Sequence, residues 1–390
     1  MAQRRITGEY RVREIAGERV RAYVPRPLPP DPPLALTPDD LSLIERANRA
    51  LGRLDGLSRL LPDPDLFIYF YVRKEAVLSS QIEGTQSSLS DLLLFEHKEA
   101  PGVPLDDVRE VSRYVAAMNH GLTRTKHDFP LSLRLIREMH ARLLTGGRGA
   151  EKTPGEFRRS QNWIGGTRPG NATYVPPPPE LLIDCLDPFE KFMHDQPERT
   201  PTLLKAALLH VQFETIHPFL DGNGRLGRLL ITLVLCTEGA LTQPLLYLSL
   251  FFKRNRRQYY ELLQRVRDEG DWESWVRFFL EGVEQTAMEA VDAAMSIRAL
   301  FEKDRQRIAK RGRAVGAALR VHELLQRSPI VSVTAAAREL SLSAPTVRSA
   351  LDSLEKAGVV REITGKLRDR MFAYRKYLDV IAEGTGGERT

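Results

Sequence analysis

The chain has 390 residues, of which 42% are hydrophobic and 28% are charged. This composition is typical of a globular protein and excludes a wholly disordered or fibrous chain. The length suggests two or three domains, and two cysteines are too few for a disulfide framework or a closed zinc site. The first residues carry charge without an apolar run, and the most apolar stretch, 229–252, is interrupted by polar residues. We therefore expect a cytoplasmic protein with no membrane contact.

Charge is distributed unevenly along the chain. The last 90 residues hold 18 Lys and Arg against 11 Asp and Glu, a net charge of +7, whereas the first 300 residues carry −1. A basic end segment suggests an anionic partner there, although a solvated basic surface accounts for the charge equally well.

The first 36 residues are polar and proline-rich, with the run PRPLPPDPPL at 26–35. We expect this segment to be extended and to lie over the first domain as a strap. Helical periodicity begins near Thr37, and a second helix is expected over about 65–83. Gly84 follows this helix, as glycine commonly does directly after a helix end.

Residues 104–146 have the pattern of two further helices. The segment 147–180 is rich in Gly, Pro, Asn and Thr and contains two short β-like runs, 162–166 and 172–177. The turn TRPGN lies between these runs, so a β-hairpin is predicted. From 180 to about 298 the pattern is helical again.

The most informative stretch is HPFLDGNGRLGR at residues 217–228. It lies between two apolar helical patterns, and Pro218 disfavours the α conformation at His217, which is therefore expected at an exposed helix end. The two glycines that follow allow a tight loop into the next helix. A helix N-terminus preceded by glycines offers backbone N–H groups and the positive end of the helix dipole, which together favour an anion.

Four side chains of this loop suit chemistry on phosphate. Arg225 and Arg228 are three residues apart, so they share a helix face and could clamp a phosphate chain. Asp221 is an oxygen ligand suited to the Mg²⁺ that accompanies phosphates, and His217 is a candidate proton acceptor. Each feature alone is more often structural, but together they indicate a phosphate site. Their spacing does not fit a P-loop or a calcium loop.

With every defining position filled, residues 217–228 resemble the Fic family signature HxFxDGNGRxxR. The resemblance implies an all-α core whose usual reaction moves AMP from ATP to a Ser, Thr or Tyr hydroxyl of a protein. It implies that His217 is the catalytic base, that Asp221 binds Mg²⁺, and that ATP and Mg²⁺ are the cofactors. The remaining motif positions implied to contact the nucleotide are Gly222, Asn223, Gly224, Arg225, Leu226, Gly227 and Arg228.

Variants of this activity stay open. Doc relatives, which phosphorylate, have Lys where this chain has Gly224, so the resemblance favours AMP transfer. Phosphocholine-transferring relatives share the motif, and some members of the family also remove AMP.

The segment SSQIEG at 79–84 resembles the Fic inhibitory motif (S/T)xxxE(G/N), with Ser79, Glu83 and Gly84 at its defined positions. A carboxylate in the last helical turn faces the negative end of the helix dipole, so Glu83 should have a cation partner, although a solvated Glu is the simpler alternative. The resemblance implies that Glu83 pairs with Arg228 and prevents the γ-phosphate from settling productively. We therefore expect an autoinhibited enzyme.

By the same resemblance, the hairpin predicted at 162–176 is the Fic flap, whose edge would align a target segment by strand addition. An ordinary surface loop is the alternative. The flap residues implied to lie nearest the nucleotide are Ile164, Gly165, Gly166 and Thr167. A Tyr pair of the family lies against adenine, which makes Tyr259 and Tyr260 candidates. Because adjacent helical residues diverge by about 100°, we expect only one of them to make the main contact.

Residues 319–380 have the pattern of three helices followed by two short strands, which resembles a winged helix-turn-helix. In that fold the third helix enters the major groove and the wing touches phosphate. The exposed readers would be Thr346, Arg348 and Ser349. The wing tip would hold Thr364, Gly365, Lys366, Arg368 and Arg370. Winged helices also serve as protein-interaction modules, so DNA binding is one of two alternatives.

We therefore predict a mainly α protein with five parts. An N-terminal Fic-associated helical region with the inhibitory helix occupies 1–100, and a Fic catalytic core with a β-hairpin flap occupies 101–298. A linker helix at 299–318, a winged helix-turn-helix at 319–380 and a disordered tail at 381–390 follow. The predicted function is autoinhibited AMP transfer to a target protein or to itself, and the number of apolar helices is compatible with a homodimer. The alternative function is a DNA-binding regulator whose Fic core is a sensor or weakly active.

Overall fold

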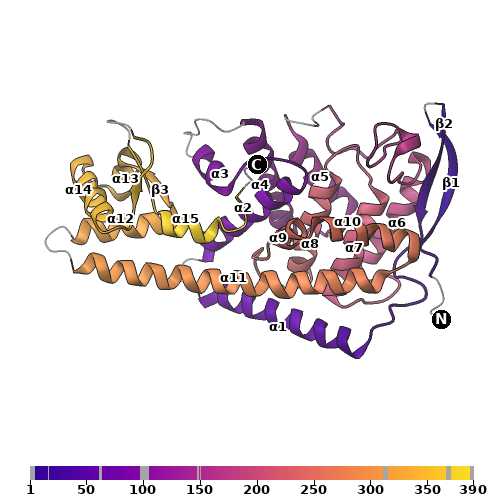
Figure 1. Ribbon diagram of the computed structural model, residues 1–390, viewed down its shortest axis with the longest axis horizontal. Coiled ribbons are helices and arrows are strands. Elements are labelled where there is room, and N and C mark those ends of the chain that lie inside the picture. The colour runs from indigo at the N-terminus through magenta and orange to yellow at the C-terminus, as the bar shows by residue number, and fades with distance from the viewer. Residues whose placement is uncertain are drawn as a thin grey trace.

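The computed structural model describes residues 5–15, 17–60, 64–96, 105–146, 149, 151–310, 315–365 and 370–386. Helices dominate, and two small antiparallel sheets lie at opposite ends of the molecule (Figure 1). A long helix, α11 (Trp272–Ala309), runs beneath the helical core and reaches the C-terminal unit. Within the described ranges, no helix combines the length and the apolar character needed to cross a membrane.

The N-terminal region consists of a hairpin and three helices: β1 (Gly8–Ile15), β2 (Glu18–Pro25), α1 (Pro38–Leu60), α2 (Pro64–Ile82) and α3 (Leu89–Glu96). The expected strap is thus partly a β-hairpin, in which Gly8 faces Pro25 and Ile15 faces Glu18. Apolar and charged residues alternate in β2, a pattern that favours a half-buried strand. Neither this pairing nor α3 was predicted from the sequence.

The helical core is built around α7, whose residues 203–216 are all buried. A helix that is buried on every face belongs in the interior of a domain, and Pro201 and Pro218 lie just outside its two ends. The core helices are α4 (Leu105–Lys126), α5 (Leu133–Leu144), α6 (Leu182–Met193), α7 (Thr202–Ile216), α8 (Asn223–Thr237), α9 (Ser249–Arg254) and α10 (Arg256–Glu269). The short 3-10 helix η2 (Pro179–Leu181) leads directly into α6.

The predicted hairpin between α5 and α6 is reduced to one antiparallel bridge, between Ile164 and Tyr174. Gly165 and Gly166 turn the chain with positive φ, and the 3-10 helix η1 (Pro169–Asn171) fills the tip. Longer pairing is prevented on one side, because residues 176–179 are all proline and proline has no N–H to donate.

The linker helix expected at 299–318 does not exist as a separate element. Residues 299–309 continue α11, and α12 (Val315–Arg327) begins a second helix. No Gly or Pro interrupts residues 283–310, so nothing in the sequence ends α11 earlier. Helix α1 packs along α11, and Asp40 and Arg277 form an ion pair between them. Residues 311–314 lie outside the described part of the chain.

The C-terminal unit confirms the predicted winged helix-turn-helix. Its elements are α12, β3 (Ile330–Ser332), α13 (Val333–Leu340), α14 (Ala344–Lys356), β4 (Arg361–Glu362) and β5 (Met371–Ala373), with the antiparallel strand order β3–β5–β4. The Ser332 side chain caps α13, and the Ser343 side chain caps α14 by accepting from the Thr346 N–H. Strand β3 was not predicted, and Lys366 and Arg368 of the predicted wing tip lie outside the described residues.

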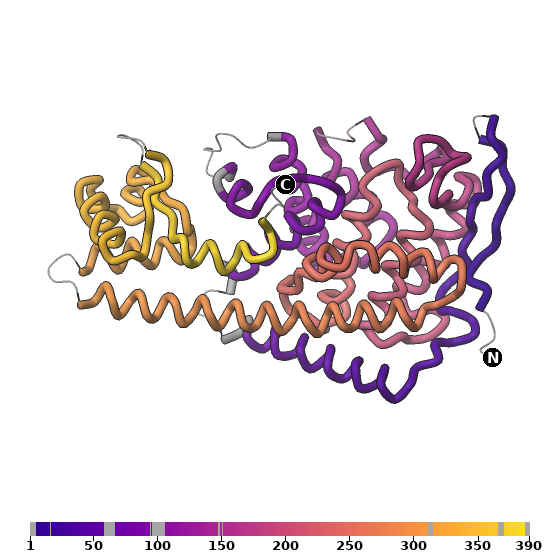
Figure 2. Tube along the Cα trace, in the orientation of Figure 1, coloured from indigo at the N-terminus to yellow at the C-terminus, as the bar shows by residue number. Residues whose placement is uncertain are grey.

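The chain continues past β5 into α15 (Arg375–Ile381), which returns toward the N-terminal helices. Figure 2 shows this yellow end of the tube beside the purple N-terminal region. Thr385 is fully buried, so the disordered tail expected at 381–390 is wrong for residues 381–386. Residues 387–390 lie outside the described residues.

Candidate active site

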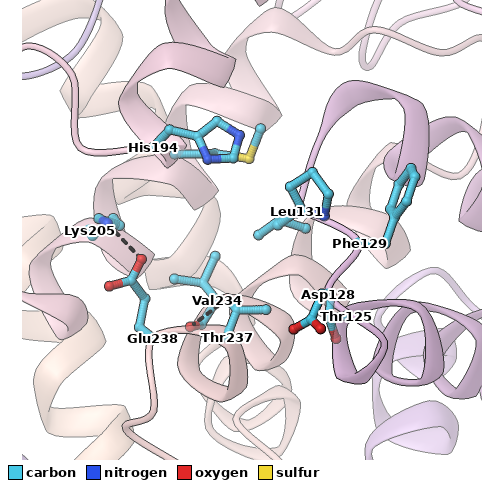
Figure 3. A pocket seen from close by; sticks show the side chains of 11 residues that line it. Thr125, Asp128, Phe129, Leu131, His194, Lys205, Val234, Thr237 and Glu238 are labelled. Atoms are coloured by element: carbon cyan, nitrogen blue, oxygen red, sulfur yellow. Dashed lines mark hydrogen bonds and ion pairs between the residues drawn. The ribbon is translucent and has the colours of Figure 1, made fainter.

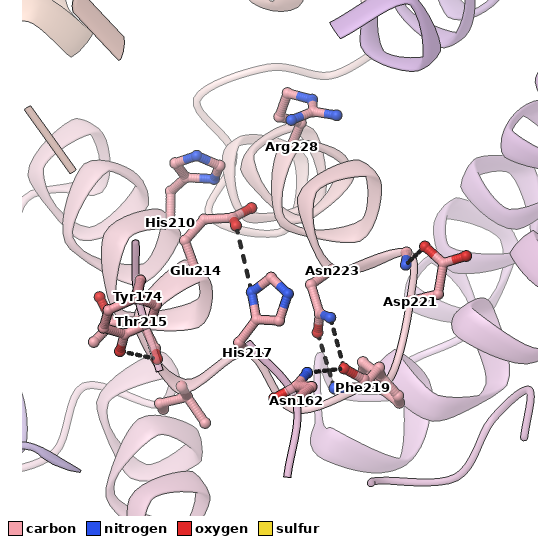
Figure 4. Close-up of polar contacts among 12 residues, drawn as sticks. Asn162, Tyr174, His210, Glu214, Thr215, His217, Phe219, Asp221, Asn223 and Arg228 are labelled. Carbon is pink, nitrogen blue, oxygen red and sulfur yellow. Dashed lines mark hydrogen bonds and ion pairs between the residues drawn. The ribbon is translucent and has the colours of Figure 1, made fainter. Parts of the chain in front are cut away.

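The loop between α7 and α8 places the motif where the ends of two buried helices meet (Figure 4). His217 follows α7 in a left-handed conformation with φ 50°, and its N–H donates to the Phe213 carbonyl at 2.9 Å. Gly222 is also left-handed, with φ 78°, and α8 begins at the next residue. A left-handed conformation costs a residue other than glycine about 1–2 kcal/mol, so the surroundings must hold His217 in place.

Asn223 holds this loop closed. Its Oδ1 accepts from the Phe219 N–H at 2.9 Å, and its Nδ2 donates to the Phe219 carbonyl at 2.8 Å. Asn162 from the flap donates to the same carbonyl at 2.8 Å. We expected the Asn223 side chain to line the phosphate cradle, but both ends of its amide are bonded to the loop backbone. Its position is therefore structural, and it ties the flap to the motif through Phe219.

His217 is mostly buried, with 17% of its side chain exposed. Burial, together with the positive charges of Arg158 and Arg267, lowers the pKa of His217 to about 3. The imidazole is therefore neutral at pH 7 and able to accept a proton. Its Nδ1 has no hydrogen-bond partner and lies 4.0 Å from Glu214 Oε2, with the two side chains pointing toward one another (Figure 4).

Glu214, which the sequence analysis missed, is a buried carboxyl group one turn before His217. Burial raises the pKa of Glu214 to about 7, and its Oε1 has no hydrogen-bond partner. A Cβ on Gly227 would lie 2.6 Å from that oxygen, so a side chain there would displace the Glu214 carboxyl group. Gly227, which we expected at the nucleotide, thus makes room for Glu214. The signal available in the sequence was the three-residue spacing from Glu214 to His217 on one helix face.

The two motif arginines are held from different helices. Arg225 is buried, and its Nη1 donates to Glu110 Oε1 of α4 at 2.6 Å, while its Nη2 lies 3.4 Å from Asp221 Oδ1. Glu110 is a second residue of the site that was not predicted from the sequence. Leu226, expected at the nucleotide, is fully buried in the core, and its N–H donates to the Gly222 carbonyl. Leu226 therefore packs within the domain.

Asp221 is the motif residue most suited to hold a cation. About a third of its side chain is exposed, and its Oδ1 accepts from the Gly222 N–H at 2.6 Å. A Cβ on Gly149 would lie 2.5 Å from Asp221 Oδ2, so glycine is required beside the carboxylate. In the described part of the chain, no group of three His, Cys, Asp or Glu side chains is arranged to hold a metal. A single carboxylate beside phosphate oxygens and water is the ligand set that Mg²⁺ commonly takes.

Two further side chains fix the loop from outside the motif. His140 donates from Nε2 to the Asp221 carbonyl at 3.0 Å and accepts at Nδ1 from the Gly155 N–H at 2.8 Å. Burial lowers the pKa of His140 to about 4, which keeps this ring neutral and able to make both bonds. Arg158 donates from Nε to the His217 carbonyl at 2.9 Å. These bonds join the segment before the flap to the backbone of the motif.

Arg228 is joined to the predicted inhibitory segment. Its Nε donates to Ser79 Oγ at 2.9 Å, and its Nη2 donates to the Ser79 carbonyl at 2.9 Å and to Glu83 Oε1 at 2.6 Å. Glu83 lies in the turn that ends at Gly84, which has φ 103°. The structure thus brings together Ser79, Glu83 and Arg228, although through one carboxylate oxygen and without a bidentate pair.

The charges of this pair stabilise one another. Burial alone would raise the pKa of Glu83 and lower that of Arg228. The charge of each partner outweighs burial, so the pKa of Glu83 is lowered and that of Arg228 is raised. A Cβ on Gly224 would lie 2.4 Å from Glu83 Oε1 and 3.1 Å from an Arg228 nitrogen. Glycine at 224 therefore gives the carboxylate the space it needs over the start of α8.

Helix α2 is fixed in turn by a buried carboxyl group, one turn before Ser79. Glu75 accepts from the Ser249 hydroxyl at 2.5 Å, from the Ser249 N–H at 3.1 Å and from the Tyr114 hydroxyl at 3.3 Å. Burial raises the pKa of Glu75 to about 7. These bonds hold the helix that carries Ser79 against α9 and α4.

The flap residues expected near the nucleotide lie at the surface or are half-buried. A Cβ on Gly165 would meet Thr173 at 2.4 Å and one on Gly166 would meet the Asn171 carbonyl at 2.4 Å, so both positions require glycine. Thr167 donates its N–H to Asn171 Oδ1 at 3.0 Å. Ile164 forms the single bridge of the flap with Tyr174. The four expected flap residues thus make their described contacts within the flap itself.

The two tyrosines differ, as helix geometry predicts. Tyr259 is buried, and its hydroxyl bonds His210 Nε2 at 2.8 Å, so it belongs to the core. Tyr260 is 42% exposed and packs against the Tyr259 ring with centroids 5.0 Å apart. Of the pair, Tyr260 is the one with ring surface for a ligand.

A cavity of about 280 Å³ lies elsewhere, at the opposite ends of α7 and α8 from the motif (Figure 3). Lys205 is buried beneath it between Asp195 and Glu238, at 2.6 and 2.7 Å. Asp128 and His194 also line this cavity, and no residue of the motif does, so the cavity is separate from the motif site.

On the winged unit, the three predicted readers, Thr346, Arg348 and Ser349, are exposed on α14. Arg370 of the predicted wing instead lies 3.6 Å from Asp352 and 3.7 Å from Glu355, both on α14. This arginine thus braces the wing against the third helix.

Comparison with known proteins identifies three matching segments. Residues 41–123 match the family described as Fic/DOC family N-terminal, and residues 130–235 match the Fic/DOC family. Residues 318–361 match winged helix-turn-helix DNA-binding.

Curated relatives carry the name protein adenylyltransferase Fic. The relative from Aedes aegypti is 34% identical over 210 residues, which are 53% of this chain and 39% of that protein. The relative from Drosophila grimshawi is 31% identical over 256 residues, 64% of this chain and 46% of that protein. The chain thus spans less than half the length of these two relatives.

Solved structures with a similar fold include a Fic family protein from Desulfovibrio desulfuricans, with a TM-score of 0.58 and 19% identity over 88% of this chain and 97% of that one. A Fic domain containing signaling protein from Bacteroides thetaiotaomicron has a TM-score of 0.51 and 20% identity over 65% of this chain and 97% of that one. These likenesses confirm the mainly helical fold. The chain thus contains segments that match the Fic/DOC family at 41–123 and 130–235, followed by a segment that matches a winged helix-turn-helix at 318–361.

Proposed function

We propose that this chain is a Mg²⁺- and ATP-dependent protein adenylyltransferase that Glu83 holds inactive. The observation that carries the proposal is the complete motif folded into one loop, with Arg228 occupied by Glu83 at 2.6 Å. The name of the curated relatives supports the same reaction class.

In the proposed reaction, the oxygen of a target hydroxyl forms a bond to the α-phosphorus of ATP. The bond from that phosphorus to the oxygen bridging the β-phosphate breaks, and pyrophosphate leaves. The hydroxyl proton passes to His217, which the low pKa keeps neutral beforehand. Such transfers are accelerated mainly by positioning of the reactants and by neutralisation of the phosphate charge. The protein contributes little covalent chemistry.

The start of α8 would receive the phosphates, because its first N–H groups and helix dipole favour anions there. Arg228 would bind the γ-phosphate once Glu83 has left. Mg²⁺ at Asp221, when bound, would neutralise charge on the phosphate oxygens. Arg225 is already paired with Glu110, so its main role would be to position Asp221 and the loop. The exposed ring of Tyr260 would face the adenine.

One flap edge is available for a target segment. On the other side, β2 already bonds the flap strand, since the Tyr23 N–H donates to the Val175 carbonyl at 2.9 Å. The opposite edge, 162–167, carries Trp163, whose side chain is 38% exposed. A target strand added along 162–167 would bring its hydroxyl toward His217.

The test uses purified protein with ATP labelled either at the α- or at the γ-phosphorus, comparing wild type with Glu83→Gly. We expect Glu83→Gly to transfer the α-label to itself or to proteins of an added lysate, and to transfer no γ-label. Transfer of the γ-label would instead indicate phosphorylation. If neither nucleotide leaves label on protein, the proposal is contradicted. Phosphocholine transfer or a sensory role would then be favoured.

A second function, DNA binding, is favoured by a separate observation. The winged unit matches a DNA-binding family, and its third helix exposes Thr346, Arg348 and Ser349. We propose that α14 lies in the major groove when this chain binds DNA. Duplex binding that weakens steeply with salt would support this role, and a measured absence of binding at low salt would contradict it.

A further inference from the structure

The winged unit is connected to the inhibitory segment through the last described residues of the chain. Helix α15 leaves β5 and packs on α2, where the rings of Tyr377 and Phe70 meet edge to face with centroids 5.4 Å apart. The chain then reaches the C-terminal end of α2, where Gln81 donates to the Thr385 carbonyl. The helix that carries the inhibitory glutamate is thus contacted by α15 at Phe70 and by the residues after α15 at Gln81.

The contact at the end of α2 is built from specific hydrogen bonds. Gln81 donates from Nε2 to the Thr385 carbonyl at 2.9 Å and to the Ser87 carbonyl at 2.9 Å. Lys253 of α9 donates to Gln81 Oε1 at 2.7 Å and to the Gly384 carbonyl at 3.3 Å. The Thr385 side chain is fully buried and donates to the Ala382 carbonyl at 2.7 Å. Residues 382–386 therefore form an ordered contact with α2 and α9.

Gln81 belongs to the same helical turn as the inhibitory carboxylate. The Ser80 carbonyl accepts from the N–H groups of Glu83 and Thr85, and the Gln81 carbonyl accepts from the Gly84 N–H. The bond from Gln81 to Ser87 closes the loop that follows. Fixing Gln81 from both sides therefore fixes the backbone that aims Glu83 at Arg228.

The backbone of the contact leaves no room for a side chain at one position. Gly384 has φ 80°, and a Cβ there would lie 2.5 Å from Cδ1 of the buried Leu250. Gly386, two residues on, has nothing within 4 Å of its Cβ position. The chain thus offers one glycine that the contact requires and a neighbouring glycine that it does not.

We propose that residues 382–386 are an intramolecular clamp on the inhibitory turn 79–84, which couples the release of Glu83 to the position of α15 and the winged domain. The contacts of the clamp stabilise the state in which Glu83 is bound to Arg228. Loss of the clamp therefore shifts the equilibrium toward the state in which Glu83 is released. The coupling of the clamp to activity rests on the proposed AMP transfer, which is the regulatory half of the inference. The contact of residues 382–386 with the inhibitory turn, which is the structural half, does not.

The test compares Gly384→Ala, the matched control Gly386→Ala, and Lys253→Met, which removes the cationic donor without altering the backbone. Amide hydrogen exchange over 80–85 reports the inhibitory turn directly and needs no activity. We expect exchange there to rise about 5- to 10-fold in Gly384→Ala and Lys253→Met and to stay at the wild-type value in Gly386→Ala. Label transfer from ATP should rise in the first two variants and should not rise further when Lys253→Met is added to Glu83→Gly.

The outcomes separate the two halves of the inference. Exchange over 80–85 that stays at the control value in both clamp variants would overturn the clamp, provided that thermal unfolding shows both proteins folded. If Gly384→Ala fails to fold, Lys253→Met alone decides that point. Faster exchange without faster transfer, while Glu83→Gly does transfer label, would overturn the coupling. Faster exchange with no transfer even in Glu83→Gly would uphold the clamp and contradict the proposed enzyme.

Discussion

The motif loop of the Fic domain and the third helix of the winged domain present their functional side chains in opposite ways. In the loop, Asn223, Arg225 and Arg228 have at most 4% of their surface exposed, and each is bonded to other parts of the protein. On α14, Thr346 and Arg348 are exposed to solvent. The proposed catalytic site is thus preorganised, as catalysis would require, whereas the proposed DNA contact would depend on surface charge that salt screens.

This contrast predicts that changes in the loop have large effects. His217→Ala in a Glu83→Gly background should reduce AMP transfer about 10²- to 10⁴-fold, because it removes the only group proposed to take the target proton. The measurement is the initial rate of α-label transfer. Equal rates in the two proteins would show that another group is the base.

Asn223 tests whether the loop is held by the two amide bonds to Phe219. Asn223→Asp keeps the acceptor for the Phe219 N–H but replaces the donor to the Phe219 carbonyl by an oxygen. We expect a loss of about 1–3 kcal/mol in the free energy of unfolding of the Fic domain, measured by denaturant unfolding. The matched change at the exposed Asn48, Asn48→Asp, should cost less than about 0.5 kcal/mol. Similar losses for both would mean that Asn223 does not hold the loop.

The winged helix should respond more weakly to single changes. Arg348→Ala should lower affinity for a mixed-sequence duplex a few-fold and reduce the slope of log affinity against log salt by about 1, as expected for one lost phosphate contact. Arg298→Ala, an exposed arginine on α11, is the control and should leave both values unchanged. An equal effect of the two changes would show that binding does not involve α14 specifically.

The smallest expected effect is in the pH dependence of transfer. The proposed base is active when neutral, and burial lowers the pKa of His217 from 6.5 to about 3, so activity should fall only as the pH drops toward that value. The Glu83 charge raises the pKa of His217, so removing it in Glu83→Gly moves the pKa lower still. The transfer rate of Glu83→Gly should therefore change little between about pH 8 and about pH 5. A half-loss near the ordinary histidine pKa would contradict the buried, neutral imidazole.

The sequence predicted the parts of the site that are local. His217, Asp221 and Arg228 lie within one motif, and the spacing of Ser79 and Glu83 identified the segment that meets Arg228. The supporting residues were not predictable in this way. Their partners come from distant segments, such as Glu110, which is 115 residues before Arg225.

The fold shows the same division between local and distant determinants. Helices with clear ends, such as α2 before Gly84, were predicted well. The linker helix and the tail were not, because α11 continues without a breaking residue and because Thr385 is held by Gln81 from 304 positions away. A short glycine-rich end segment has no periodicity that would indicate such a contact.

The most direct test of the account is one assay of label transfer from α-labelled ATP with Mg²⁺, comparing wild type, Glu83→Gly, and Glu83→Gly with His217→Ala. The account predicts little label in wild type, at least about 10-fold more in Glu83→Gly, and almost none in the double variant. This order would establish the transfer, the restraint by Glu83 and the role of His217 together. Wild type labelling as fast as Glu83→Gly, or no labelling in any of the three, would contradict the claim of a complete site that Glu83 holds inactive.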